Sequence, residues 1–208
     1  MSASVIPEYS RVVVIGGGII GCSVAYHLAE MGCEVVLLER DQLTSGTTWH
    51  AAGLMTTYGS GSETILGIRK HSMELYKRLE QETGQQTGFV PCGFIEVAAD
   101  ADRLEEYRRI TAFNRLHGND IHELSPAEVK ELFPFAEVDT MQAGFYAEND
   151  GRINPVDVTM ALARGARMKG AKIFQNTPVR GVLTRNGTVT GVRTDQGEIR
   201  SEFVVNCA

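Results

Sequence analysis

The stretch VVVIGGGIIG, residues 12–21, limits the possible folds more than any other part of the chain. Its apolar run suits a buried strand and leads into Gly16, Gly18 and Gly21, which have the G-x-G-x-x-G spacing. Helical spacing continues to Gly32, and a second apolar run then ends at Glu39. This order of strand, glycines, helix and strand predicts a Rossmann-like βαβ unit.

The same residues predict a dinucleotide site. Gly16 permits a tight turn, Gly18 lets the backbone approach a pyrophosphate, and Gly21 lets the helix pack closely on the strand. Free amide groups and the dipole at the start of the helix attract the anion. Glu39 is placed to accept hydrogen bonds from the adenosine ribose. A glycine motif alone is weak, but strand, helix and acid together make a bound dinucleotide the better interpretation.

The loop after Glu39 bears on which dinucleotide is bound, because NAD and FAD proteins share the glycine pattern. An NAD enzyme of this topology would normally continue through further βα units. Here DQLTSGTTWHAAGL follows at once and offers the hydroxyl groups of Ser45, Thr47 and Thr48 among glycines. Such a loop can line a flavin, and we therefore expect FAD.

The remaining patterns predict an α/β fold with a discontinuous FAD-binding domain, residues 1–88 and 149–208. Residues 89–148 read as the start of an inserted α+β substrate-binding domain, with a capping box from Ser125 to Glu128. AKIFQ, VRGVLTR, VTGVRTD and EIRSEFVVNCA, separated by turn signals, predict a small antiparallel meander. The chain ends inside an apolar strand, so we expect it to be incomplete at its C-terminus.

Composition excludes several classes of function. The net charge of -6, without a long single-sign run, argues against nucleic acid or an anionic membrane as partner. The four cysteines form no C-x-x-C pair, so no metal site is expected. No apolar run has the roughly 18 residues of a membrane helix, and the N-terminus does not resemble a signal. We expect a cytoplasmic protein, or one of the mitochondrial matrix if the chain is a processed eukaryotic one.

Several motifs together resemble the sarcosine and dimethylglycine dehydrogenase family of D-amino-acid-oxidase-like flavoproteins. They are VVVIGGGIIG, LTSGTTWHAAGL, LEQETGQQTGF, GFIEVA, DGRINP and the closing VVNCA. The resemblance spans essentially the whole chain. It implies FAD contacts from Gly16, Gly18 and Gly21 to the pyrophosphate, from Glu39 to the ribose, and from Ser45, Thr47 and Thr48 to the middle of the cofactor. The backbone of Val179 would lie near the adenine.

The resemblance also implies a role for His50. In the mitochondrial dehydrogenases of this family, the histidine of the loop is the covalent attachment point of FAD. A neutral imidazole nitrogen suits such a bond if the loop holds it close to the flavin. The alternative is that His50 only packs beside, or hydrogen-bonds to, a noncovalent flavin.

The implied reaction is FAD-dependent oxidation of an N-methyl amino acid, such as sarcosine or dimethylglycine, by hydride transfer to the flavin. An electron-transfer flavoprotein or oxygen would be the acceptor. No catalytic base is identifiable, and Arg152 is a candidate only for the substrate carboxylate. The alternative is a non-catalytic regulatory homologue, similar to the regulatory subunit of pyruvate dehydrogenase phosphatase, that keeps the fold. Fold alone does not separate the two.

Overall fold

The structure is a computed structural model that describes residues 5–208. The chain forms two compact units. Unit 1 contains residues 1–52, 78–88 and 154–208, and unit 2 contains residues 53–77 and 89–153. Unit 2 therefore includes residues 53–77 and 149–153 in addition to the expected segment 89–148. Each unit is described separately.

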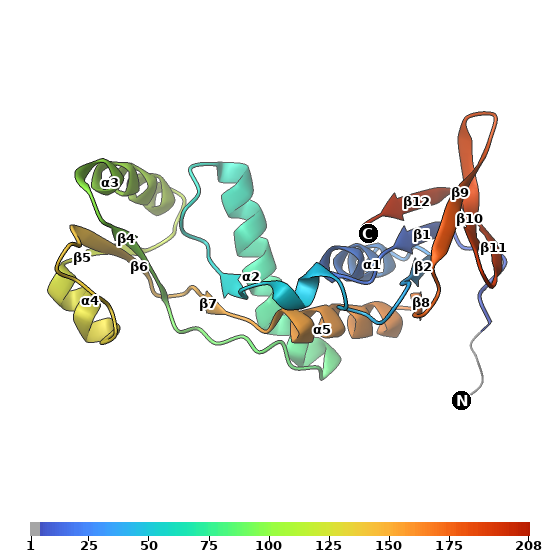
Figure 1. Cartoon of the computed structure of the whole chain (residues 1–208), viewed down its shortest axis with the longest axis horizontal. Helices are drawn as coiled ribbons and strands as arrows, with labels where there is room; N and C mark the ends of the chain where they lie inside the picture. The colour runs from blue at the N-terminus through green and yellow to red at the C-terminus, as the bar shows by residue number, and fades with distance from the viewer. Residues whose placement is uncertain (1–4) are drawn as a thin grey trace. The chain divides into compact units, whose positions relative to one another are not determined.

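A four-stranded parallel sheet forms the centre of unit 1 (Figure 1). Its strand order is β12-β1-β2-β8, with β12 at Phe203–Asn206, β1 at Val12–Ile15, β2 at Val35–Leu38 and β8 at Lys172–Phe174. β2 is buried along its whole length and β1 along most of it. Continuous apolar runs suit such strands because both faces of a parallel sheet are covered. The predicted βαβ unit is confirmed.

Two helices pack against this sheet and against each other. They are α1, Ile19–Glu30, and α5, Pro155–Met168. Their contact is close because Gly165 has no side chain: a Cβ there would lie 2.7 Å from the ring of Tyr26. α5 begins with Asn154 as its cap and Pro155 in its first turn.

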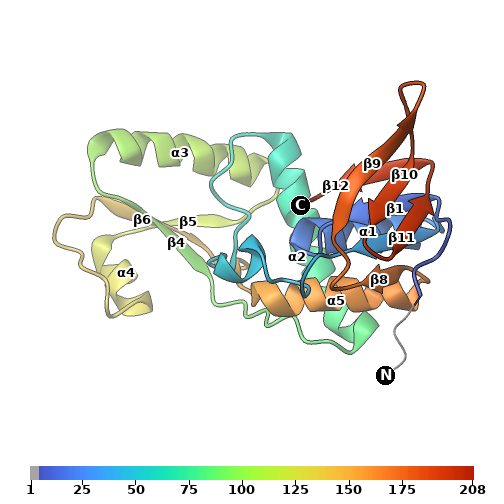
Figure 2. The same cartoon turned by 45° about the vertical axis from the view of Figure 1, so that its right-hand side comes forward.

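Three antiparallel strands complete unit 1, in the order β11-β10-β9 (Figure 2). They are β9, Val179–Arg185, β10, Thr188–Thr194, and β11, Gly197–Arg200. Val192 and Ile199 from this meander share one apolar cluster with Val13, Val36 and Leu38 of the parallel sheet. The two sheets are therefore held together by burial of apolar surface.

The meander is smaller than the sequence predicted, because its expected first and last strands belong to the parallel sheet. β8 pairs with β2, and β12 pairs with β1, both in parallel. The segment EIRSEFVVNCA is two strands, broken at Ser201 and Glu202. The prediction was wrong here because a short apolar run does not reveal its partner strand, which is chosen by burial on both faces.

Unit 2 is built on a three-stranded antiparallel sheet in the order β4-β6-β5. Tyr58, Ala98, Ile121 and Phe145 belong to its buried core. The capping box of α4 is confirmed, with Ser125 and Glu128 bonded in both directions. α2 begins at Glu63, and its residues from Arg78 onward belong to unit 1. The elements of unit 2, with all of α2, are β3 (Leu54–Met55), α2 (Glu63–Thr83), β4 (Phe94–Ala98), α3 (Ala101–Leu116), β5 (Ile121–Leu124), α4 (Pro126–Leu132), β6 (Ala143–Ala147) and β7 (Gly151–Arg152).

A buried carboxylate joins two loops of unit 2. Asp150 is fully buried and accepts hydrogen bonds from the amide of Thr57 at 2.9 Å, its hydroxyl at 2.7 Å, and the amide of Tyr58 at 3.2 Å. These bonds compensate the cost of removing a charge from water. The aspartate of the DGRINP stretch therefore has a structural role.

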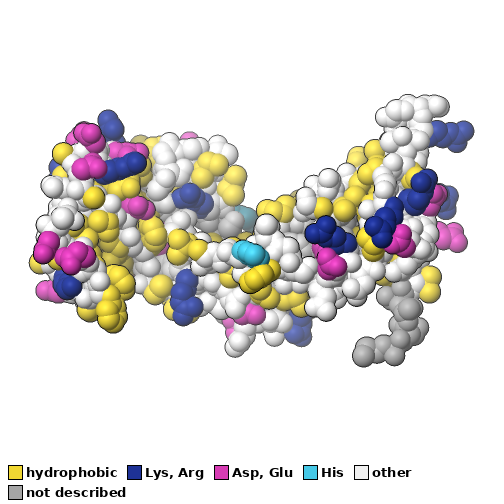
Figure 3. All heavy atoms as spheres, in the orientation of Figure 1, with side chains coloured by type: hydrophobic (Ala, Val, Ile, Leu, Met, Phe, Trp, Pro, Cys, Tyr) yellow, Lys and Arg dark blue, Asp and Glu magenta, His cyan; other side chains and the backbone are white. Residues whose placement is uncertain are grey.

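Basic and acidic side chains are interspersed on the face drawn in Figure 3. Ion pairs agree with this mixture: Arg180 contacts Asp195 at 2.7 Å, and Arg193 contacts Glu198 at 3.1 Å. Among residues 5–208, no helix is long and apolar enough to cross a membrane.

Candidate functional site

The glycines after β1 differ in what their missing side chains allow. Gly16 has φ +106°, and a Cβ there would lie 2.8 Å from the backbone of Cys207. A Cβ at Gly21 would overlap the carbonyl oxygen of Gly16. At Gly18 only the hydroxyl of Thr48 would be met, at 3.1 Å. Gly16 and Gly21 are thus required by the packing of the protein itself, whereas Gly18 leaves space at the start of α1.

The start of α1 presents free hydrogen-bond donors. Gly18 is the N-cap and contributes no side-chain cap. Within the described residues, the amides of Gly18 and Ile20 donate to no protein group, because their places in the first turn precede the helical hydrogen bonds. Free amides at a helix N-terminus attract an anion. This arrangement fits the pyrophosphate of a dinucleotide.

Glu39 lies directly after β2, and only 9% of its surface is exposed. One carboxylate oxygen accepts the amide of Gly17 at 2.6 Å, and the other accepts the amide of Asp41 at 2.8 Å. The acid therefore links the glycine turn to the loop after β2. Each carboxylate oxygen has a second acceptor position, so hydroxyl groups of a ribose can still be bound.

The loop that carries the candidate hydroxyl groups ends in a short 3₁₀ helix, η1, Thr47–His50. Ser45, Thr47 and His50 are exposed, whereas Thr48 is buried. The Thr48 hydroxyl oxygen accepts the amide of Ile19 at 3.0 Å, in the first turn of α1. The predicted loop residues therefore lie next to the glycine turn.

Trp49 and His50 contact each other on this loop, with ring centroids 3.8 Å apart in an edge-to-face arrangement. Trp49 is 60% exposed, so it does not pack beneath the loop. The imidazole of His50 is exposed in the same short helix as the buried Thr48.

Val179 is the first residue of β9 and packs against the cluster that contains Val36 and Leu38. The loop before it is tied to the end of β2, because the amide of Thr177 donates to the carbonyl of Glu39 at 2.8 Å. Val179 thus follows the segment bonded to Glu39, although the two are far apart in sequence. The residues predicted to bind FAD all belong to unit 1.

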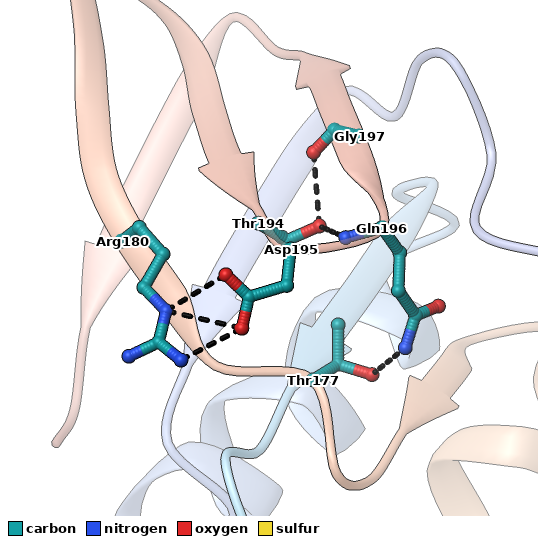
Figure 4. Close-up of polar contacts among 6 residues, drawn as sticks. All are labelled: Thr177, Arg180, Thr194, Asp195, Gln196 and Gly197. Atoms are coloured by element: carbon teal, nitrogen blue, oxygen red, sulfur yellow. Dashed lines mark hydrogen bonds and ion pairs between the residues drawn. The ribbon is translucent and has the colours of Figure 1, made fainter.

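A polar network fixes the segment before Val179 (Figure 4). The side-chain amide of Gln196 donates to the hydroxyl of Thr177 at 3.2 Å. Arg180 and Asp195 form a pair of side-by-side hydrogen bonds between β9 and the turn after β10. The β10–β11 turn is thereby attached to the loop that contacts Glu39.

Sequence reasoning missed three residues of this site. Gly17 donates to Glu39, Gln175 accepts the amide of Leu43 at 2.7 Å, and Thr177 contacts the backbone of Glu39. A signal for Gly17 was present, since it is the extra glycine of IGGG and its Cβ would lie 2.9 Å from Glu39. No local pattern marks Gln175 or Thr177, because their partners come from the other end of the chain.

Two other features of unit 1 do not belong to the dinucleotide site. Burial raises the pKa of the Cys22 thiol to about 12, so this residue of α1 stays protonated at neutral pH. A cavity of about 390 Å³, lined by Tyr26, Glu30, Glu82 and Lys169, includes residues at the end of α1 remote from the glycine turn. The Cys22 thiol is directed to the carbonyl of Gly17 at 3.7 Å, and the cavity lies at the other end of the helix.

The substrate residue considered from sequence lies in unit 2. Arg152 is exposed on β7 and pairs through its backbone with Val90, at 2.8 and 3.1 Å. Its side chain forms no ion pair with another described residue. Arg152 remains a candidate for a carboxylate contact.

Comparison with known proteins gives a consistent result. A family described as FAD dependent oxidoreductase matches residues 11–208. The chain is 40% identical to human mitochondrial sarcosine dehydrogenase over 210 residues, covering 98% of this chain and 23% of the relative. It is 42% identical to rat mitochondrial dimethylglycine dehydrogenase over 206 residues, covering 97% and 24%. It is also 40% identical to the mouse mitochondrial regulatory subunit of pyruvate dehydrogenase phosphatase over 204 residues, covering 98% and 23%.

The fold is shared with solved structures. L-proline dehydrogenase from P. horikoshii superposes with a TM-score of 0.91 at 30% identity, over 98% of this chain and 54% of that one. The chain thus spans about a quarter of the length of its sequence relatives and about half of this structure. The family match covers nearly all of the chain and agrees with the glycine turn, Glu39 and the sheet order. The chain belongs to the DAO family of FAD-dependent oxidoreductases.

Proposed function

We propose that this chain supplies the FAD-binding part of an amine oxidoreductase that acts on an N-methyl amino acid, such as sarcosine or dimethylglycine. The observation that carries this proposal is the position of His50, exposed on a loop that Thr48 fastens to the start of α1. The similarity of the chain to sarcosine and dimethylglycine dehydrogenases supports this class of substrate. Unit 1 would bind FAD, and unit 2 would begin the substrate-binding domain.

The residues of unit 1 divide the binding of FAD among them. The amides of Gly18 and Ile20 would hold the pyrophosphate, with Gly16 and Gly21 shaping the turn. Glu39 would accept the ribose hydroxyls, and its negative charge disfavours a cofactor with a 2′-phosphate. Ser45, Thr47 and Thr48 would contact the middle of the cofactor, and the backbone of Val179 would lie beside the adenine.

Bound FAD supplies a two-electron acceptor for a substrate C–H bond next to nitrogen. The protein's part is to hold the acceptor rigidly, so that binding does not require reordering of the loop. The hydrogen bonds that the amide of Gly17 donates to Glu39 and the amide of Ile19 donates to Thr48 would provide this rigidity. An electron-transfer flavoprotein or oxygen would accept the electrons afterwards.

His50 would form a covalent bond to the flavin, its imidazole nitrogen replacing one hydrogen of the 8α-methyl group. The two protons and two electrons released by loss of this C–H bond and the imidazole N–H bond would pass to the electron acceptor proposed above. An imidazole nitrogen is a nucleophile when neutral, and the exposed ring is available to react. Because Thr48 fixes the backbone two residues earlier, the ring is confined near the proposed site. The competing interpretation is a noncovalent contact between the same ring and the flavin.

Acid denaturation of the full-length holoprotein tests the bond. We expect fluorescent flavin to remain on the polypeptide, and a peptide containing TTWHAAGL to carry the added mass of the flavin. His50→Ala should keep FAD only reversibly. Release of all flavin from a fully loaded wild-type sample would remove the covalent assignment while leaving FAD binding intact.

A second candidate function is a regulatory protein that keeps the fold without turnover. The 40% identity to a regulatory subunit of pyruvate dehydrogenase phosphatase supports it. The two candidates differ in one measurement, the bleaching of flavin absorbance when sarcosine or dimethylglycine is added without oxygen. Bleaching supports the enzyme, and an unchanged spectrum with every N-methyl amino acid tried supports the regulator.

The same relatives support a proposal for the cellular compartment of the protein. The animal relatives named above are mitochondrial proteins, which favours the mitochondrial matrix if this chain comes from a eukaryote. A bacterial chain would be cytoplasmic. Fractionation of cells that express the full-length protein distinguishes these locations.

A further inference from the structure

The first turn of α1 is capped by a residue distant in sequence. A helix usually receives a side-chain cap from its own N-cap residue. Here that residue is Gly18, which has no side chain, and the amide of Ile19 instead donates to the hydroxyl oxygen of Thr48 at 3.0 Å. The loop after β2 therefore supplies the cap that the glycine turn cannot.

Thr48 differs from its neighbours in the loop by its burial. Only 6% of its surface is exposed, whereas Thr47, Trp49 and His50 are exposed. Its carbonyl also accepts the amide of Ala51 at 3.2 Å, which closes the 3₁₀ turn. One residue thus fixes both the loop backbone and its attachment to α1.

The hydroxyl of Thr48 retains a hydrogen-bond donor. A hydroxyl can accept and donate at once, and the bond from Ile19 uses only its acceptor function. Its oxygen lies 3.1 Å from the position of a Cβ at Gly18, beside the free amides of the turn. The remaining hydrogen can therefore be directed toward an anion bound there.

We propose that Thr48 is a positioning residue that assembles the flavin site before FAD binds, by fastening the loop of residues 44–50 to the first turn of α1. This inference rests on the flavin site proposed above. Thr48 holds the amide of Ile19 and the segment that leads to His50 in one arrangement. Without the hydroxyl, the loop would have to be ordered at the expense of binding free energy.

The test measures reversible FAD binding in full-length protein carrying His50→Ala, so that no covalent bond interferes. Thr48→Val removes the hydroxyl with little change in size, whereas Thr48→Ser keeps it. Thr184→Val, at an exposed position of β9, is the matched control. Quenching of flavin fluorescence by the apoprotein gives the dissociation constant. Hydrogen exchange of the apoprotein follows the Ile19 amide and residues 44–50.

We expect Thr48→Val to weaken FAD binding about tenfold, equivalent to ~1.4 kcal/mol. The same variant should accelerate exchange at Ile19 and in the loop. Thr48→Ser and Thr184→Val should both keep the FAD affinity and the exchange rates of the His50→Ala parent protein. A serine variant as impaired as the valine variant would show that the hydroxyl is not responsible and would overturn the proposal, as would unchanged affinity in Thr48→Val.

Two further arms keep the test decisive. If Thr48→Val does not fold, hydrogen exchange in the wild-type apoprotein still tests whether the cap forms before FAD binds. Rapid exchange of the Ile19 amide would contradict a preformed cap. Complete release of flavin from denatured wild-type protein would reject the His50 bond of the proposed function. The affinity and exchange measurements would be unaffected by that result, so the two failures are distinguishable.

Discussion

The carboxylate of Glu39 and the amide of Gly17 are joined by a 2.6 Å hydrogen bond, so the acid that follows β2 also fixes the turn that follows β1. The other carboxylate oxygen is bonded to the amide of Asp41. A single side chain therefore connects two loops of the site before any ligand contributes.

Glu39→Gln should disturb both the fold and FAD binding. A glutamine offers one acceptor oxygen where the carboxylate offers two, so one of the two amides loses its partner. We expect the free energy of unfolding of the apoprotein to fall by about 1.5–3 kcal/mol, and FAD to bind more weakly. Glu34→Gln, at an exposed position before β2, is the control for urea unfolding. Equal stability of the two variants would contradict a role for Glu39 in the loops.

Gly18→Ala and Gly21→Ala should have different effects. At Gly21 the new methyl group would overlap the carbonyl of Gly16, so both stability and FAD binding should fall. At Gly18 the backbone φ is -79°, which alanine adopts readily, and the methyl group meets only the Thr48 hydroxyl. That variant should fold with a change within about 1 kcal/mol and lose FAD affinity. Thermal unfolding of the apoproteins and flavin titration separate the two effects.

Asp150→Ala should destabilise unit 2. Three donors from Thr57 and Tyr58 would be left buried without an acceptor, and we expect a loss of about 3 kcal/mol or more. Asp150→Asn keeps one oxygen for the two amides, and the Thr57 hydroxyl can turn to accept from the new amide, so its effect should be smaller. Asp139→Asn, at an exposed position of the same unit, should be neutral. Urea midpoints that do not rise from Asp150→Ala to Asp150→Asn to Asp139→Asn would contradict the structural role of Asp150.

Alkaline pH should destabilise the protein. Burial is the main cause that raises the pKa of the Cys22 thiol from 9.0 to about 12, and those of Tyr26 and Tyr58 from 10.0 to about 12. The unfolded chain ionises these groups first, so the stability present below pH 9 is lost as pH rises toward 12. Each group should contribute about 1.4 kcal/mol per pH unit above its ordinary pKa. Urea unfolding between pH 8 and 11 measures the slope, which Tyr58→Phe should reduce; an identical slope in that variant would contradict the assignment.

Local patterns predicted the parts of this fold that depend on neighbouring residues. The βαβ unit, the capping box at Ser125 and the start of α5 at Asn154 were all predictable, because each is encoded within one or two turns of chain. The proposed ribose contact of Glu39 was inferred from the same local unit. Its hydrogen bond with the amide of Gly17 was not predicted, because it is visible only when the two loops are placed together.

Contacts between distant segments were not predictable in the same way. The amide of Ile19 donates to Thr48 and the amide of Leu43 donates to Gln175, and such bonds between backbone amides and distant side chains leave no periodicity in the sequence. The prediction that put β8 and β12 in the antiparallel meander was wrong for a related reason. An apolar run indicates that a strand is buried, but not which strand it pairs with. The sequence predicts Ser45, Thr47 and Thr48 as equivalent candidates for cofactor contacts, whereas the structure distinguishes Thr48 by its burial and its bond with Ile19.

The pairing of β1 with β12 has a consequence for synthesis of the protein. β1 leaves the ribosome well before its partner strand β12, which lies about 190 positions later in the chain. Until then, one edge of β1 has exposed backbone groups that can pair with another chain. Completion of the parallel sheet must follow translation of nearly the whole segment, which makes the nascent chain dependent on protection from aggregation during that interval.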